Sequence, residues 1–254
     1  MKLIATLTLS ALFSFVSLGQ NLAPNPSFEL GTNMPSDWSL TSPNGQLQPF
    51  AHSGSNSVNI TADGSYMSRW QALNSTATTG QTYAVRFWTA ATNAISGSCF
   101  GGFNTAYVDF PRPGPAWTNF SLVAYVPNVS GQYLNVGQVV MNGTIYFDDV
   151  EMYRVTPVHK QVGGITLEAG EKIQSGKYSY ASRYDALGGS YSRCLLDANT
   201  MYATFRWYMN AGSALVYRHD VGGLPLSSAT VKAAIWNYNN ITSTSLQVEA
   251  STNG

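Results

Sequence analysis

The stretch Tyr83-Ala84-Val85-Arg86-Phe87-Trp88 alternates, with the valine and phenylalanine on one face and the arginine and tryptophan on the other. Successive side chains of a β-strand point to opposite faces, so this alternation predicts a strand with one buried face. Similar patterns recur in residues 57–60, 120–126 and 133–140, the last of which precedes an expected Asn142-Gly143 turn. Turn-forming residues separate these segments, and sustained helical periodicity is absent from the sequence. The fold class predicted is all-β, built as a two-sheet sandwich or jelly roll.

The composition limits the kinds of partner. Charged residues make up 10% of the chain and aromatic residues 13%, whereas charged residues make up roughly 25% of an average soluble domain. The 13 basic and 13 acidic side chains balance, and no basic run is present. The chain therefore lacks the electrostatic footprint of a protein that binds nucleic acid or an anionic membrane, and neutral ligands fit it better.

The N-terminal residues 1–19 have the pattern of a secretory signal peptide. Lys2 precedes an apolar run over residues 3–16, and the small residues Ser17 and Gly19 follow it. The mature chain is expected to begin at Gln20. Because the run is too short to span a bilayer, we expect a secreted, extracellular protein with no membrane insertion.

The length of the mature chain suits two domains. The first is predicted over residues 20–155, a linker over 156–162 and a second β-sandwich over 163–254. Strands of the second domain are expected over residues 201–209, 214–219, 230–238 and 245–250. The chain stops at a turn signal after the last of these, so we expect this second module to be incomplete and further domains to lie beyond Gly254.

Two motifs bracket the first module, Asn25-Pro26-Ser27-Phe28-Glu29 and Tyr146-Phe147-Asp148-Asp149-Val150-Glu151-Met152-Tyr153. Between them lie, in order, Trp38, the His52-Ser53-Gly54 turn, Gly80-Gln81-Thr82-Tyr83 and Trp117. This order resembles carbohydrate-binding modules of the family 4, 9 and 22 type, which are galactose-binding-like jelly rolls. The second region loosely resembles a discoidin-type or other galactose-binding-type sandwich. The resemblance implies sugar binding without catalysis.

A sugar-binding site needs aromatic rings that stack on sugar faces and polar groups that bind hydroxyls. The segment Tyr66-Met67-Ser68-Arg69-Trp70-Gln71 alternates, so it offers two different faces. The resemblance places the binding groove on the concave face of the sandwich and nominates Tyr66, Trp70, Phe103, Asn104 and Tyr107, with Arg69 and Gln71 instead if the strand register is reversed. The competing interpretation of these aromatic residues is core packing. Trp38, Trp88 and Trp117 are interpreted as structural, and residues 100–103 as a loop near the ligand or a bulge.

The resemblance also implies a structural calcium ion where the first and last strands of the module meet. Glu29 and Asp149 match those positions, with the carbonyl of Ser27 and the turn at His52 as further oxygen sources. Calcium prefers such oxygen ligands. The alternative is that Glu29 and Asp149 accept backbone N–H bonds without a metal. Asp148 replaces Asp149 if the register differs.

The sequence offers little for catalysis. Most glycoside hydrolases need two facing carboxyl groups, and between the two bracketing motifs the sequence offers only Asp37, Asp63 and Asp109, in turn-like contexts. No Gly-x-Ser-x-Gly or His-Glu-x-x-His motif occurs. We therefore predict that the chain is not an enzyme. A lyase or esterase is the weakest alternative, and its acids would come from Glu168, Glu171, Asp185, Asp197 and Asp220.

Cys99 and Cys194 fall on opposite sides of the predicted domain boundary. Two interpretations stay open, a disulfide between the domains and, as the favoured one, two buried free thiols. Zinc is disfavoured because neither cysteine has a second ligand at zinc spacing.

The function predicted from the sequence is a secreted, non-catalytic module that binds a polysaccharide or oligosaccharide and holds an attached enzyme or a cell near a glycan. The alternative is a structural or adhesive extracellular spacer built of β-sandwiches.

Overall fold

The computed structural model describes residues 19–41, 44–74, 77–155, 160–168, 170–181, 190–223, 225–233 and 247–251. Every regular element in these ranges is a β-strand, so the predicted all-β class is confirmed. A search of the same ranges for a helix long and apolar enough to cross a membrane finds none. The predicted signal peptide lies outside the described residues except for Gly19.

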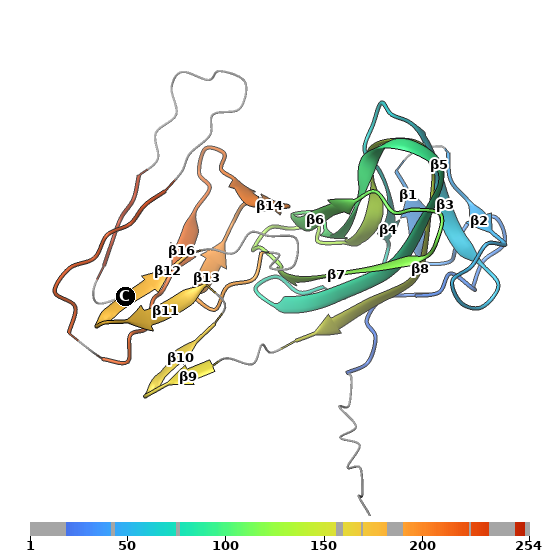
Figure 1. The fold of residues 1–254 in the computed structure, drawn as a ribbon. Coiled ribbons are helices and arrows are strands. Elements are labelled where there is room, and N and C mark those ends of the chain that lie inside the picture. The colour runs from blue at the N-terminus through green and yellow to red at the C-terminus, as the bar shows by residue number, and fades with distance from the viewer. Residues whose placement is uncertain are drawn as a thin grey trace, which may run out of the picture.

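Two long strands organise the first 155 residues, β5 (Thr82–Phe103) and β8 (Leu134–Arg154). They run antiparallel along nearly their whole length, from the pair Tyr83–Arg154 to the pair Phe103–Leu134. Both strands bend near their middle, where the register of β5 shifts between Thr92 and Ser98. Each strand therefore contributes one half to each of two layers (Figure 1).

Shorter strands complete both layers. In the first layer, β7 (Thr118–Tyr125) pairs with the first half of β5, β3 (Ser57–Asp63) pairs with the second half of β8, and β2 (Leu47–Gln48) pairs with β3. In the second layer, β6 (Ala106–Pro111) pairs with the second half of β5, β4 (Ser68–Ala72) with the first half of β8, and β1 (Trp38–Leu40) with β4. The strands expected over residues 57–60, 83–88, 120–126 and 133–140 lie in β3, β5, β7 and β8, with only the ends 126 and 133 outside.

The predicted turn at Asn142-Gly143 is wrong, because β8 continues through it to Arg154. The residues form part of the bend at which the strand passes from one layer to the other. Gly143 has φ +135° and Gly97, in the facing bend of β5, has φ +84°. A Cβ on either glycine would collide with backbone atoms of the other strand. The turn-like composition therefore marks a close backbone crossing.

The core lies between the two layers. Phe87 packs against Phe110 with ring centroids 5.8 Å apart, and Tyr83 packs against Phe103 at 5.6 Å. The indole Nε1 of Trp70 donates a hydrogen bond to the carbonyl oxygen of Asn59 in the opposite layer, at 3.0 Å. The loop or bulge expected over residues 100–103 is instead the regular end of β5.

The second region adds a hairpin to the first module. Strand β14 (Met201–Ala203) pairs in parallel with β6, and β15 (Arg206–Tyr208) pairs with β14. The amide of Tyr202 donates to the carbonyl of Thr105 at 2.7 Å, and that of Thr204 to the carbonyl of Tyr107 at 2.9 Å. The single strand expected over residues 201–209 is therefore wrong, since a turn divides it. Figure 1 shows β14 beside the free edge of β6.

The remaining strands of this region form two-stranded sheets. They are β9 (Lys160–Val162) with β10 (Ile165–Leu167), β11 (Glu171–Gln174) with β12 (Lys177–Tyr180), and β13 (Leu195–Ala198) with β16 (Leu215–Tyr217). Strand β16 lies within the stretch expected over 214–219. Residues 230–233 and 247–250 are not strands, contrary to expectation, and residues 234–246 lie outside the described ranges. The predicted domain boundaries stay a prediction.

Both cysteines are free and buried. Cys99 lies in the core of the sandwich, and Cys194 lies in the second region. The structure therefore agrees with the favoured interpretation of two buried thiols. Burial raises the pKa of each thiol to about 12, so both stay protonated near neutral pH.

Candidate functional site

The strand register places a set of polar side chains on the outer face of the second layer. One row across the strands runs Arg69, Gly137, Phe100 and Asp109. The next row runs Gln71, Asn135, Gly102, Tyr107, Ala203 and Arg206. Paired residues on neighbouring strands share a face of the sheet. We call the face formed by Arg69, Gln71, Phe100, Tyr107, Asp109, Asn135 and Arg206 the polar face.

Packing at two glycines confirms which side of the layer points outward. A Cβ on Gly101 would meet the ring of Phe87, which belongs to the core. A Cβ on Gly137 would instead meet the ring of Phe100, which lies 5.3 Å from that of Tyr107. Phe100 is buried but packs with Tyr107 on the other side of the sheet. Phe100 and Asn135 are therefore buried within the polar face. The half-buried side chains around them are those of Arg69, Gln71, Tyr107, Asp109 and Arg206.

Three buried polar atoms on the polar face have no hydrogen-bond partner: Arg69 Nε, Asp109 Oδ1 and Asn135 Oδ1. The Asn135 side chain is fully buried, and its Nδ2 donates to Asn104 Oδ1 at 2.6 Å and to the carbonyl of Tyr133 at 2.8 Å. These two hydrogen bonds fix the orientation of the Asn135 side-chain amide, and its Oδ1 accepts no hydrogen bond within the described residues. A buried polar atom without a partner costs about 1–3 kcal/mol, so such atoms commonly indicate a bound ligand or water.

Burial also changes the acidity of two groups on the polar face. It raises the pKa of Asp109, and the Thr204 hydroxyl and the Arg206 guanidinium only partly oppose the effect. Burial, together with the charge of Asp109, raises the pKa of Tyr107. The Tyr107 hydroxyl therefore stays protonated and serves as both donor and acceptor.

The hairpin of the second region contributes Arg206 and Tyr208 beside Tyr107. Arg206 Nη2 donates to the hydroxyl of Tyr208, and the guanidinium carbon lies 4.8 Å from the centre of that ring. It also lies 5.1 Å from the ring of Phe205. The sequence alone does not identify these residues, because their position depends on a parallel pairing between segments about one hundred residues apart. No local pattern in the sequence signals that pairing.

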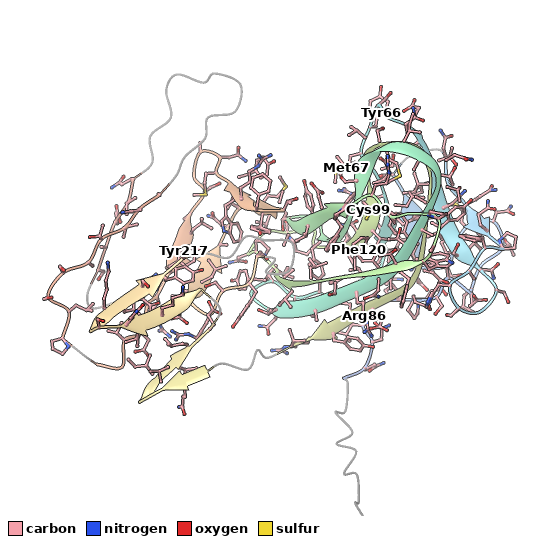
Figure 2. The ribbon with its side chains drawn as sticks, viewed as in Figure 1. Tyr66, Met67, Arg86, Cys99, Phe120 and Tyr217 are labelled. Carbon is pink, nitrogen blue, oxygen red and sulfur yellow. The ribbon has the colours of Figure 1, made fainter. Side chains whose placement is uncertain are left out.

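The structure places the nominated ligand residues in the core, on or beside the polar face, and in an exposed loop. Trp70 and Phe103 are fully buried in the core, so the expectation that they line a groove is corrected. Arg69 and Gln71 lie on the polar face, which corresponds to the reversed register of that strand, and Tyr107 lies on the same face. Asn104 supports that face through Asn135. Tyr66 is 76% exposed in the loop before β4, at the outer tip of the sandwich in Figure 2.

A separate hollow lies at the bend of β5, lined by residues 91–95 and 112–115. Arg112 is its sole ionisable side chain. None of the unpartnered buried atoms in the described ranges belongs to this lining. The polar face is therefore the stronger candidate for a binding site.

The residues nominated for calcium gather around the turn at residues 52–56. Asp149 accepts hydrogen bonds from the Ser53 hydroxyl at 2.7 Å and interacts with His52 Nδ1 at 2.7 Å. The Ser27 side chain also hydrogen-bonds to Asp149, and although burial opposes the change, these donors lower the pKa of that carboxyl. Glu29 Oε1 accepts the amides of Ser55 and Asn56 at 2.8 Å and 2.9 Å.

Asp148, the alternative ligand, is fully buried and also serves this turn. Its Oδ2 accepts the amides of His52 at 2.7 Å and Ser53 at 3.1 Å, and its Oδ1 accepts the amide of Asp149 at 2.7 Å. Burial raises its pKa to about 6 in spite of these bonds. Backbone N–H groups point at Glu29 and Asp148, and the donors to Asp149 are the Ser53 hydroxyl and the His52 ring. The residues as placed therefore fit a metal-free arrangement better than a cation site. The calcium ion stays a prediction.

Removal of metal tests the calcium prediction directly. Because hydrogen bonds already satisfy Glu29, Asp148 and Asp149, we expect a chelator to leave the melting temperature unchanged. Thermal unfolding with EDTA, and then with excess calcium, measures this. An ion that binds only the folded protein adds about 2.7 kcal/mol to the free energy of unfolding when its free concentration is one hundred times its Kd. A lower melting temperature in EDTA that calcium restores would establish the ion.

A second group of ionisable residues joins the small sheets of the second region. The buried carboxylate of Glu171 accepts Arg193 Nε at 2.9 Å, the Tyr178 hydroxyl at 2.8 Å and the amide of Glu168 at 2.8 Å. Glu168 accepts the Ser192 hydroxyl at 2.8 Å. Arg193 and the other donors hydrogen-bond to both carboxylates, so we interpret this cluster of ionisable residues as structural. Asp185, another acid considered for catalysis, lies outside the described residues.

No protein-family model matches the chain, and no curated protein sequence matches it. Among solved structures, the chain is similar to the CBM22-1 xylan-binding domain from Paenibacillus barcinonensis Xyn10C. The identity is 12%, the TM-score is 0.44, and the match covers 52% of this chain and 93% of that domain. It is also similar to TmCBM61, solved in complex with beta-1,4-galactotriose, at 20% identity and a TM-score of 0.39, over 54% of this chain and 99% of that one.

A third similar structure is the enzymatically active domain of the Bacteriophage CBA120 tailspike protein 4, at 14% identity and a TM-score of 0.39, over 53% of this chain and 21% of that one. The predicted resemblance to carbohydrate-binding modules is confirmed as a resemblance, since modules of families 22, 16, 61 and 4 are among the similar structures. Because the identities are low and the TM-scores are below 0.5, the function proposed below rests on the polar face itself.

Proposed function

We propose that the polar face binds a polysaccharide chain lying across strands β4, β8, β5, β6, β14 and β15, and that the protein is a secreted, non-catalytic glycan-binding protein. The observation that carries the proposal is the pair of half-buried side chains that each keep an unpartnered polar atom within the described residues, Arg69 as a donor and Asp109 as an acceptor. Sugar hydroxyls both donate and accept hydrogen bonds, so a glycan satisfies both kinds of atom.

The side chains around these atoms support the same ligand class. Tyr107 offers a half-buried ring for contact with a sugar face, and Gln71 offers an amide on the same row. No hydrogen bond of the Gln71 side chain is found within the described residues, so its amide is available to a hydroxyl. The signal-peptide pattern of residues 1–19 supports secretion.

The carboxylates of the polar face favour binding over glycoside hydrolysis. Hydrolysis by most such enzymes needs two carboxyl groups on either side of the scissile bond. Along the two described rows of the polar face, Asp109 is the sole carboxylate. The pair that this chemistry requires is therefore missing from these rows.

Substitution of Tyr107 tests the proposal. We expect Tyr107→Ala to weaken binding about tenfold to a polysaccharide that the wild-type protein binds. The reason is that stacking contacts and a hydroxyl are lost together. Affinity gel electrophoresis of the full chain against soluble plant, fungal and algal polysaccharides gives the dissociation constants. Circular dichroism and thermal unfolding confirm that the variant is folded.

Tyr66→Ala is the matched control, since Tyr66 is exposed and lies off the polar face. Unchanged binding in this control, with loss in Tyr107→Ala, supports the polar face. The reverse result moves the site to the loop before β4. If no polymer retards the wild-type protein, the proposal fails and the structural or adhesive spacer becomes the better hypothesis.

A further inference from the structure

Two arginines stand out on the polar face because neither has an acidic partner among the residues that the structure describes. Arg69 and Arg206 are half-buried and make no ion pair, whereas Arg193, the other half-buried arginine in the described ranges, pairs with Glu171. The other arginines and lysines whose burial the structure describes are exposed. A half-buried guanidinium loses part of its hydration shell. A carboxylate, sulfate or phosphate is the group whose hydrogen bonds best replace the lost water.

The charge of the polar face is otherwise small. Asp109 is its sole acid along the two rows, so the two arginines leave a net positive charge. Arg206 lies near enough to Asp109 to oppose the rise in the pKa of that carboxyl that burial causes. Arg69 Nε is buried without a hydrogen-bond partner. Both guanidinium groups thus keep charge available for a ligand.

The two cations lie at opposite ends of the polar face. Arg69 is on β4 and Arg206 is on β15, with β8, β5, β6 and β14 between them in the sheet. Neighbouring strands lie about 4.8 Å apart, so the Cα atoms of the two arginines are separated by roughly 24 Å along the sheet. Between them, on β6, lie the half-buried side chains of Tyr107 and Asp109. A chain with spaced anionic groups and hydroxyls between them matches this arrangement.

We propose that the ligand of the polar face is an acidic polysaccharide, whose carboxylate or sulfate groups bind Arg69 and Arg206 while its hydroxyls bind the half-buried Tyr107 and Asp109. This inference rests on the proposed glycan binding and names its ligand class. It also gives the second region a role, because the hairpin of β14 and β15 supplies one of the two cations. A module cut after residue 155 would lack that half of the site.

Matched polymers that differ only in charge test the inference. We would measure binding of the full chain to polygalacturonate and to its fully methyl-esterified form, and to a sulfated galactan and its desulfated form. We expect each acidic polymer of the preferred type to bind about tenfold more tightly than its neutral counterpart, since charge-assisted hydrogen bonds are roughly twice as strong as neutral ones. Comparison of the two pairs distinguishes carboxylate from sulfate.

Three variants assign the effect to the named residues. Arg69→Gln and Arg206→Gln keep polar side chains but remove the charges, and each is expected to abolish most of the preference for the acidic polymer. Arg154→Gln is the control, because Arg154 is exposed at the end of β8 and removal of its charge tests for unspecific attraction. The control is expected to keep the full preference.

The outcomes separate this inference from the proposed function. Loss of the preference in Arg69→Gln and Arg206→Gln, but not in Arg154→Gln, supports it. Equal binding of acidic and neutral polymers, or equal losses in all three variants, overturns the inference and leaves glycan binding on the polar face intact. Failure to bind any of these polymers overturns the inference, and failure to bind any polymer of the plant, fungal and algal panel overturns both. Thermal unfolding of each variant excludes loss of the fold as the cause.

Discussion

Trp70→Ala is expected to lower the free energy of unfolding by about 3 to 5 kcal/mol, the usual cost of removing a large buried aromatic side chain. Trp70 is fully buried, and its indole bonds the carbonyl of Asn59 in the other layer at 3.0 Å. The substitution leaves a cavity between the layers and removes a hydrogen bond across them. Urea unfolding, followed by tryptophan fluorescence and circular dichroism, measures the change.

The control for this variant is Tyr66→Ala, since Tyr66 is 76% exposed. Substitutions at such surface positions usually change stability by less than about 0.5 kcal/mol. A Trp70→Ala protein with wild-type stability and no glycan binding would contradict the assignment of Trp70 to the core. It would return Trp70 to the binding site that the resemblance implied.

Glu171→Gln is expected to cost about 3 to 5 kcal/mol, because breaking a buried ion pair leaves the remaining charge unpaired. Glu171 is buried and binds Arg193, Tyr178 and the amide of Glu168. The matched control is Glu151→Gln, which breaks the more exposed pair with Arg86. Such surface pairs contribute about 0 to 1 kcal/mol. Urea unfolding of the two variants gives the comparison.

The pH dependence of the wild type checks the same carboxylate. Burial alone would raise the pKa of Glu171, but Arg193 and the other donors outweigh it and lower the pKa from 4.5 to about 2. The folded state therefore binds fewer protons than the unfolded state between these values. The stability from Glu171 is fully present above pH 4.5 and is lost as the pH falls toward 2. Equal acid sensitivity of wild type and Glu171→Gln would contradict this assignment.

The strands were predictable because their signal is local. The alternation over residues 83–88 and 120–126 reports one buried face, and both segments are strands. The bends were not predictable, because Asn142 and Gly143 have the composition of a hairpin turn. Only the backbone crossing of β5 and β8 explains why glycine is needed there.

The candidate site was predictable only in part. The alternation in residues 66–71 separated two faces but left open which of them points outward. The alternation looks the same whichever face of the strand is buried. Which face points outward therefore depends on how the strand pairs with other strands. Arg206 was beyond reach, since its place beside Tyr107 depends on β14 joining β6.

The sequence by itself determined that this protein is built of strands, where the strands of the first module lie and which small set of polar and aromatic residues was available to a ligand. These properties follow from side-chain alternation and turn chemistry within a few residues. The tertiary structure alone decided that Trp70 and Phe103 are core, that Arg69 and Gln71 face outward and that the hairpin at residues 201–208 extends the same sheet. Those choices were made by packing and backbone pairing between segments far apart in the chain, where local sequence carries no signal.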